Sequence, residues 1–322
     1  MTARRRRLAL PAADRWATTG PVRRLDRQLL ERWDTDGWFV LEDAVGADAL
    51  AAAQRDLPGV FPTAEEFADD RDPERNRPLR TRSDAVLPRF PFASQALNRL
   101  VVHDDVIDVA VALLATSDVR LYQGMVSAKY TDGAPDYDQL LHADYANHTL
   151  VVPRPDAGYQ QVEMFLYLSD VGADTAATRM VSRRLTGDIP VERTYLSFDE
   201  YPELYAAEVP AAGPAGSLLV YRPDTYHRGT VVRAARSARF LLHIAFKRPG
   251  TDWLGFQSWP SAAEGMDWYR FVPRASVRQL SVLGFPAPGD PYWTEATLAG
   301  VGARYPQLDM TPWRVAMPAD VR

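Results

Sequence analysis

The stretch Gln139-Leu-Leu-His-Ala-Asp-Tyr-Ala-Asn-His148 places a histidine and an aspartate two residues apart. Residues two apart on a β-strand point to the same face, so His142 and Asp144 can bind one metal ion together if this stretch is extended. A single His-x-Asp triplet is weak support for such a site, because triplets of this kind often arise by chance. A metal site therefore requires a third ligand from a strand that is distant in the sequence.

The best third ligand is His227, which lies in the segment Tyr221-Arg-Pro-Asp-Thr-Tyr-His-Arg-Gly-Thr230, just after an apolar run. The chain has only five histidines, so a histidine at the end of a predicted strand carries more weight than usual. Two imidazoles and one carboxylate on one face of a metal form the facial triad of non-haem Fe(II) oxygenases, which leaves the opposite face open. The sequence therefore predicts His142, Asp144 and His227 as metal ligands.

A later segment, Arg239-Phe-Leu-Leu-His-Ile-Ala-Phe246, has the period-two alternation of a β-strand. This period places Arg239 on a face with Leu241 and Ala245. A guanidinium on a largely apolar face is costly unless it meets an anion, and its planar fork fits a carboxylate through two hydrogen bonds. We therefore predict that Arg239 binds an anionic ligand. Arg236 is a rival, but it lies in a predicted turn where a charge can reach water.

The order His142-x-Asp144, then His227, then Arg239 about a dozen residues later resembles the phytanoyl-CoA dioxygenase family of Fe(II)- and 2-oxoglutarate-dependent oxygenases. The resemblance begins near Leu30-Glu-Arg-Trp-Asp-Thr-Asp-Gly-Trp-Phe-Val-Leu41 and extends to about position 247. It implies that the protein uses Fe(II), 2-oxoglutarate and dioxygen. It also implies that Arg239 pairs with the distal carboxylate of 2-oxoglutarate.

The segment Arg120-Leu-Tyr-Gln-Gly-Met-Val-Ser-Ala-Lys-Tyr130 is predicted to be a strand. One of its faces is expected to carry Leu121, Gln123, Met125, Ser127 and Lys129. The resemblance implies that Gln123 and Lys129 help to hold 2-oxoglutarate, while the alternative is that they lie on a solvated face. We add Thr230, at the end of the His227 segment, to the expected co-substrate contacts.

His148 is six residues after His142 and shares its strand parity if the strand stays regular. We interpret it as a residue that supports the ligands or stacks on the co-substrate, rather than as a fourth metal ligand. A hydrogen-bonded surface histidine is the alternative.

Strands of similar length that are separated by turns and preceded by helices fit a mainly β fold with a helical layer. We expect a core of double-stranded β-helix type, the jelly roll that cupins also have. The expected organisation is a disordered basic tail over residues 1–20, a jelly-roll oxygenase domain over 21–250, and an aromatic-rich extension over 251–322 packed on that domain. Residues 58–92 mix proline and charged residues without periodicity and are predicted to be a long excursion.

The resemblance implies hydroxylation of an unactivated C–H bond, with release of succinate and carbon dioxide. Related halogenases carry alanine or glycine where this chain has Asp144, so the carboxylate favours hydroxylation. Relatives commonly have a Gly-Pro pair and a Pro-Gly-Ser-His turn where this chain has Ala176-Ala-Thr-Arg-Met-Val-Ser-Arg-Arg184. This departure, near the metal, makes a small metabolite or natural-product intermediate our expected substrate. A cupin-type metal-dependent isomerase or hydrolase without 2-oxoglutarate, and a non-catalytic jelly-roll binding protein, are the alternatives.

The composition limits the other partners. The chain has 322 residues, 46% of them hydrophobic and 25% charged, which suits one elaborated domain with a substantial core. A net charge of −5 gives no general attraction to nucleic acid or to an anionic membrane. The absence of cysteine excludes disulfides and thiolate ligands and fits a cytoplasmic protein. We expect a monomer or homodimer that binds a small-molecule substrate.

Overall fold

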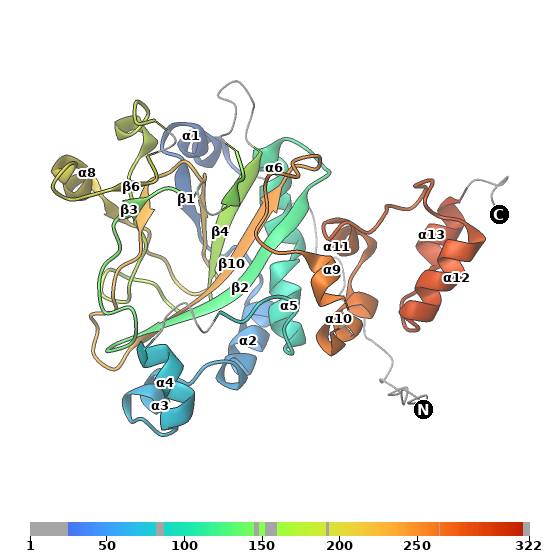
Figure 1. The fold of residues 1–322 in the computed structure, drawn as a ribbon, viewed down its shortest axis with the longest axis horizontal. Coiled ribbons are helices and arrows are strands. Elements are labelled where there is room, and N and C mark those ends of the chain that lie inside the picture. The colour runs from blue at the N-terminus through green and yellow to red at the C-terminus, as the bar shows by residue number, and fades with distance from the viewer. Residues whose placement is uncertain are drawn as a thin grey trace.

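A computed structural model of the chain describes residues 25–81, 87–144, 148–151, 160–190, 193–263 and 265–317. Within these residues, ten strands form two antiparallel sheets with helices around them (Figure 1). The predicted disordered tail over residues 1–20 lies outside the described residues. The prediction of a β-rich core with a helical layer is confirmed.

The larger sheet has the strand order β1-β8-β4-β10-β2. Its strands are β1 (Trp38–Leu41), β8 (Leu218–Tyr221), β4 (Gln161–Tyr167), β10 (Ala238–Lys247) and β2 (Arg120–Tyr130). The smaller sheet has the order β6-β3-β9-β5-β7. Its strands are β6 (Tyr195–Leu196), β3 (Leu141–His142), β9 (His227–Arg228), β5 (Arg179–Met180) and β7 (Val209–Pro210). The sheets therefore join segments far apart in the sequence, including the three that carry the predicted metal ligands.

Alternate residues of the larger sheet enter two different cores, as the period of two requires. One face, which includes Met164 and Ile244, packs with the helices α2 (Ala47–Asp56), α5 (Gln95–Val101) and α6 (Asp104–Leu114). The other face, which includes Leu219 and Leu241, packs against residues such as Met180 of the smaller sheet. The site residues of the larger sheet lie on this second face, between the two sheets.

The described chain begins with a helix, a strand and a second helix. The first helix, α1 (Arg27–Thr35), begins where the Asp26 carboxylate accepts a hydrogen bond from the Leu29 backbone N–H at 2.8 Å. The next elements are β1 and α2. A side-chain cap of this kind satisfies one of the free N–H groups of the first turn, so the helix starts at a defined residue.

The pairing of β2 with β10 shifts register between Ala245 and Phe246. Gln123 is opposite Ala245, but Leu121 is opposite Phe246 and packs in the helix-facing core. The expectation that Leu121 shares a face with Gln123 is therefore wrong. A bulge places two residues of one strand against one of the other and reverses the side-chain alternation beyond it.

The predicted excursion over residues 58–92 is partly helical in its described part, although its sequence has no helical periodicity. This segment contains the helices α3 (Ala64–Ala68) and α4 (Pro73–Thr81), after the short 3-10 helix Leu57–Gly59. A capping box between Thr63 and Glu66 starts α3. Phe67 then stacks on Tyr130 with ring centroids 4.1 Å apart. Local capping and one aromatic contact thus order a stretch that has no helical periodicity.

The C-terminal extension is helical and rich in buried tryptophan. Its helices are α9 (Trp259–Ala262), α10 (Met266–Phe271), α11 (Val277–Ser281), α12 (Glu295–Arg304) and α13 (Thr311–Ala316), while α8 (Pro202–Ala207) lies beside the smaller sheet. The Trp259 indole donates to the Leu121 carbonyl at 2.9 Å, which ties α9 to β2. Figure 1 shows α12 and α13 at the far end of the molecule from β3 and β6. No helix in the described part of the chain is long and apolar enough to cross a membrane.

Candidate metal centre and anion site

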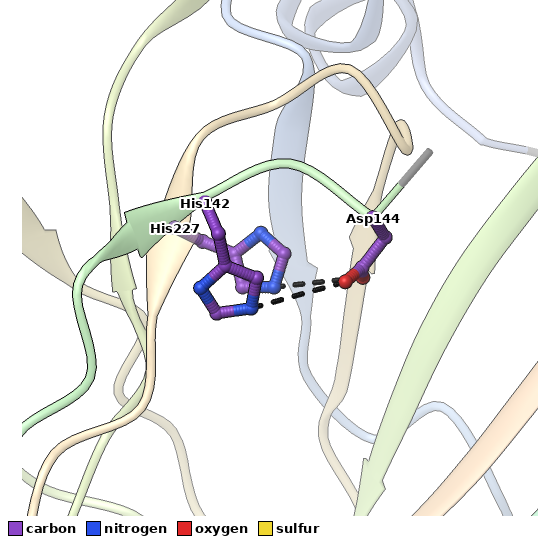
Figure 2. Close-up of side chains that lie close together, drawn as sticks. All are labelled: His142, Asp144 and His227. Atoms are coloured by element: carbon purple, nitrogen blue, oxygen red, sulfur yellow. Dashed lines mark ion pairs between the residues drawn. The ribbon is translucent and has the colours of Figure 1, made fainter. Parts of the chain in front are cut away.

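The structure brings His142, Asp144 and His227 together (Figure 2). His142 ends β3 and His227 begins β9, and the two residues are direct partners in the antiparallel pairing of these strands. Their ring centroids are 4.6 Å apart. Asp144 lies just beyond β3, with Oδ1 at 3.8 Å from Nε2 of His142 and Oδ2 at 3.5 Å from Nε2 of His227. One ligand atom from each residue lies within 4.8 Å of the others, so the set can hold one metal ion.

Both imidazoles are oriented by backbone carbonyl groups. Nδ1 of His142 lies 2.9 Å from the Leu140 carbonyl, and Nδ1 of His227 lies 3.0 Å from the Thr225 carbonyl. These contacts favour a proton on Nδ1 and leave the Nε2 lone pair directed at the centre of the cluster. Burial, with a contribution from His227, also lowers the pKa of His142, which favours the neutral form that a metal needs.

The Asp144 carboxylate is held in its charged form. Burial alone raises the pKa of such a carboxyl, but the neighbouring His227, His148 and His142 and the hydrogen bond from Tyr221 outweigh it, so the pKa of Asp144 is lowered. The centre therefore supplies one carboxylate and two imidazole nitrogens, a set suited to a divalent ion such as iron.

Arg239 lies on β10, and its side chain is buried between the sheets, with the residue only 5% exposed. One Nη1 hydrogen is donated to the Ala176 carbonyl, but Nε has no hydrogen-bond partner among the described residues. Within that part of the chain no carboxylate forms an ion pair with this guanidinium either, and burial lowers the pKa of Arg239 to about 10. A buried, incompletely paired guanidinium is unfavourable by itself, so the pocket around it is suited to an anion.

Two of the other predicted co-substrate contacts lie beside Arg239. Lys129 is directly opposite Arg239 in the β2–β10 pairing, and its Nζ donates to the Thr230 carbonyl at 2.9 Å. The Thr230 hydroxyl donates in turn to the Ala177 carbonyl at 3.2 Å. Burial and the nearby Arg239 lower the pKa of Lys129 to about 7, so an anion bound here would favour its charged form.

Gln123 does not join this group. It is buried on the same strand but six residues from Lys129, which corresponds to roughly 20 Å along an extended chain. It lies opposite Ala245, near the end of β10 that is distant from Arg239. The predicted contact of Gln123 with 2-oxoglutarate therefore has no support from its position relative to Arg239.

His148 is buried, which excludes the alternative of a surface histidine. Its Nδ1 lies 2.8 Å from Oε1 of Glu163, and the Tyr122 hydroxyl donates to the same carboxylate. The Gln161 amide donates to the Tyr122 hydroxyl at 3.0 Å. Burial disfavours the charged imidazole, but Glu163 outweighs burial and raises the pKa of His148 to about 9. His148 is thus the cation of a buried ion pair and lies outside the metal cluster.

This ion pair predicts a pH dependence of stability. The raised pKa of His148 means that its contribution is complete below about pH 6.5 and is lost as the pH rises to about 9. Over that interval the free energy of unfolding of the metal-free protein should fall by about 1.4 kcal/mol per pH unit relative to Glu163→Gln. Urea unfolding of both proteins across this range measures the difference, and parallel curves would contradict the prediction.

The remaining histidines have other partners. Nδ1 of His103 accepts the Asp105 backbone N–H at the start of α6, in the helical layer. Nε2 of His243 lies 2.7 Å from the Ser127 hydroxyl, and the His243 ring packs against Phe165 with centroids 4.4 Å apart. Burial, reinforced by Arg239, lowers the pKa of His243 to about 3. Neither residue belongs to the metal cluster of the described residues.

Sequence reasoning missed Tyr122, Glu163 and Tyr221 as site residues. Glu163 interrupts an otherwise apolar strand, and a charge in such a strand was the available signal. The two tyrosines gave no signal, because a tyrosine in a strand is most often a packing residue.

Comparison with known proteins identifies the family of the chain. The sequence model of the family described as phytanoyl-CoA dioxygenase (PhyH) matches residues 33–240. No curated protein matches the chain at the sequence level.

Among solved structures, EvdMO1 has a TM-score of 0.50 at 16% identity, over 69% of this chain and 50% of that one. HygX from Streptomyces hygroscopicus, with nickel and 2-oxoglutarate bound, has a TM-score of 0.49 at 17% identity, over 70% of this chain and 88% of that one. The α-ketoglutarate-dependent epimerase SnoN from nogalamycin biosynthesis has a TM-score of 0.48 at 14% identity, over 69% of this chain and 80% of that one.

Proposed function

Because the chain belongs to the phytanoyl-CoA dioxygenase family, we propose that it is an Fe(II)- and 2-oxoglutarate-dependent oxygenase. Its reaction is the hydroxylation of an unactivated C–H bond in a small metabolite or natural-product intermediate. The core is a jelly roll, a proposal supported by the two facing antiparallel sheets that carry the site between them.

The observation that carries this proposal is the buried guanidinium of Arg239, which lies on the larger sheet and faces the smaller sheet that carries the two histidines of the metal cluster. Its Nε lacks a partner among the described residues, and Lys129 adds a second cationic group beside it. 2-Oxoglutarate is a dianion whose 2-oxo acid end can bind a metal while its other carboxylate binds an arginine. The residues therefore fit both Fe(II) and the co-substrate.

In this proposal His142, Asp144 and His227 hold Fe(II), and Arg239 fixes the distal carboxylate of 2-oxoglutarate. The metal and co-substrate supply the oxidising power for a C–H bond, with dioxygen consumed and succinate and carbon dioxide released. Three protein ligands leave the remaining positions of the metal free. Burial of Arg239 and Lys129 excludes water from the co-substrate carboxylate and strengthens its pairing with the two cations.

Exposed apolar side chains near His142 support an organic substrate. Tyr195 pairs with His142 across β3 and β6, and its ring centroid lies 5.9 Å from that of His142. Tyr195 is 63% exposed, and Leu140 beside it is 49% exposed. Exposed apolar side chains next to a metal ligand favour an organic substrate with apolar surface, and they give no support to a purely ionic one.

The experiment incubates the protein anaerobically with Fe(II) and 2-oxoglutarate, adds dioxygen with each of a set of candidate metabolites, and measures succinate. A substrate should stimulate succinate formation, and its product should contain one oxygen atom from labelled dioxygen. A product without added oxygen would replace hydroxylation by epimerisation, ring closure or desaturation. A reaction without succinate would favour the cupin-type isomerase or hydrolase. Absence of Fe(II)-dependent 2-oxoglutarate binding would favour a non-catalytic protein.

A further inference from the structure

Tyr221, the last residue of β8, contacts two of the three residues of the metal cluster. Its hydroxyl donates a hydrogen bond to Oδ2 of Asp144 at 2.8 Å. Its ring centroid lies 4.8 Å from that of His227, at an angle of 58°. The side chain is buried, and its hydroxyl has Asp144 as its hydrogen-bond acceptor. The phenol is therefore a hydrogen-bond donor beside the metal cluster.

The phenol has one proton, and the surrounding network directs it to Asp144. The nearest competing carboxylate is Glu163, which is opposite Tyr221 in the β4–β8 pairing. Glu163 already accepts from Tyr122 and pairs with His148. Because Tyr122 and His148 already satisfy Glu163, the Tyr221 hydroxyl donates its hydrogen bond to Asp144.

The two oxygens of Asp144 consequently differ. Oδ2 accepts the hydrogen bond from Tyr221, whereas Oδ1 has no hydrogen-bond donor among the described residues. A carboxylate oxygen that accepts a hydrogen bond is a weaker electron donor to a metal than its free partner, and it is held in one orientation. Oδ1 is therefore the better ligand of the pair.

From this asymmetry we propose that Tyr221 is a positioning residue. Its hydrogen bond to Oδ2 keeps that oxygen off the metal, so that Asp144 binds the metal through Oδ1 alone. A carboxylate bound through both oxygens would occupy an additional position of the metal. Binding through one oxygen keeps that position available for the two-point binding of 2-oxoglutarate. The inference rests on the proposed metal and co-substrate of this site, and it adds the residue that determines how many positions remain open.

The test compares the wild type with Tyr221→Phe, which removes only the hydroxyl. Tyr130→Phe is the matched control, because Tyr130 is likewise buried and its hydroxyl is likewise hydrogen-bonded. That hydroxyl donates to the Pro62 carbonyl at 2.6 Å, and Tyr130 lies in the helix-facing core. Each protein is loaded with Ni(II), which does not turn over. Calorimetry then measures the affinity for Ni(II) and, at saturating Ni(II), the affinity for 2-oxoglutarate. Crystal structures of the Ni(II) forms give the number of Asp144 oxygens on the metal.

In the wild type and in Tyr130→Phe, Asp144 should bind Ni(II) through one oxygen. In Tyr221→Phe it should bind through two, and the affinity for 2-oxoglutarate should fall about 10-fold or more, the size of effect that outer-shell partners of metal ligands usually have. The inference is overturned if Tyr221→Phe keeps one-oxygen binding and the affinity of the control. It is also overturned, without any variant, if the Ni(II)-loaded wild type binds through both oxygens or loses the phenol contact. Failure of the wild type to bind Ni(II) or 2-oxoglutarate would instead refute the proposed function.

Discussion

Replacing His142, Asp144 or His227 by alanine is expected to weaken Fe(II) binding by at least about 100-fold, more than the loss of an outer-shell partner costs, and to stop turnover. The reason is that side chains from two strands and a loop would share a single ion, so each removal would leave an incomplete set of ligands. Since His142 ends a two-residue strand at the edge of the site, the fold should survive. Calorimetric titration with Fe(II) under anaerobic conditions measures the affinity, and circular dichroism checks the fold.

His103→Ala and His243→Ala are the matched controls for this prediction. His103 caps α6 and His243 contacts Ser127, so both variants should keep near-normal Fe(II) affinity even if they unfold at a lower temperature. Fe(II) affinity that survives one of the three replacements would remove that residue from the ligand set. Loss of Fe(II) from either control would mean that the wrong histidines were chosen.

Arg239→Ala should raise the concentration of 2-oxoglutarate needed for half-saturation by one to several orders of magnitude, because loss of one partner of a buried charge pair costs about 2–5 kcal/mol. Fe(II) affinity should change little, since the guanidinium donates to the Ala176 carbonyl and is not part of the metal cluster. The visible metal-to-ligand absorption band of the anaerobic Fe(II)·2-oxoglutarate complex, titrated with the co-substrate, gives the affinity directly.

The structure provides a matched control for this arginine as well. Arg236 is exposed and its Nη2 lies 2.6 Å from Oδ1 of Asp69, so it already has an anionic partner and can reach water. Arg236→Ala should leave the titration curve unchanged. A shifted curve for Arg236→Ala with a normal curve for Arg239→Ala would reverse the assignment of the anion site. No absorption band in the wild type would refute the dioxygenase itself.

Several features were readable from the sequence because they depend on local period. The alternation in Arg239–Phe246 predicts a strand, and β10 (Ala238–Lys247) confirms it with Arg239 buried. The family was recognisable from the order and spacing of His142, Asp144, His227 and Arg239, and the match over residues 33–240 confirms that recognition. These features can be predicted from the sequence because strand parity and chain order do not depend on distant contacts.

Other features were not predictable, because they depend on how two strands align. The bulge in β2, where Tyr122 is the extra residue opposite Ala245 and Phe246, places Leu121 in the helix-facing core, and the Tyr122 hydroxyl donates to Glu163. One extra residue in a strand reverses the face of every side chain beyond it. A prediction that misses such a bulge therefore assigns the wrong residues to the site. The helix α3 was missed for a different reason, since a capping box and a contact with Tyr130 order it in place of an amphipathic period.

The sequence by itself determined which residues can supply metal ligands and a cation for an anionic co-substrate, because these assignments rest on residue chemistry and on the period of a strand. Only the tertiary structure decided which buried polar groups pair with one another. Tyr221 and Asp144 are 77 residues apart, and Tyr122 and Glu163 are 41 residues apart. Hydrogen bonds reach only about 3 Å, so such pairs form only where strand order, register and a bulge bring two side chains into contact.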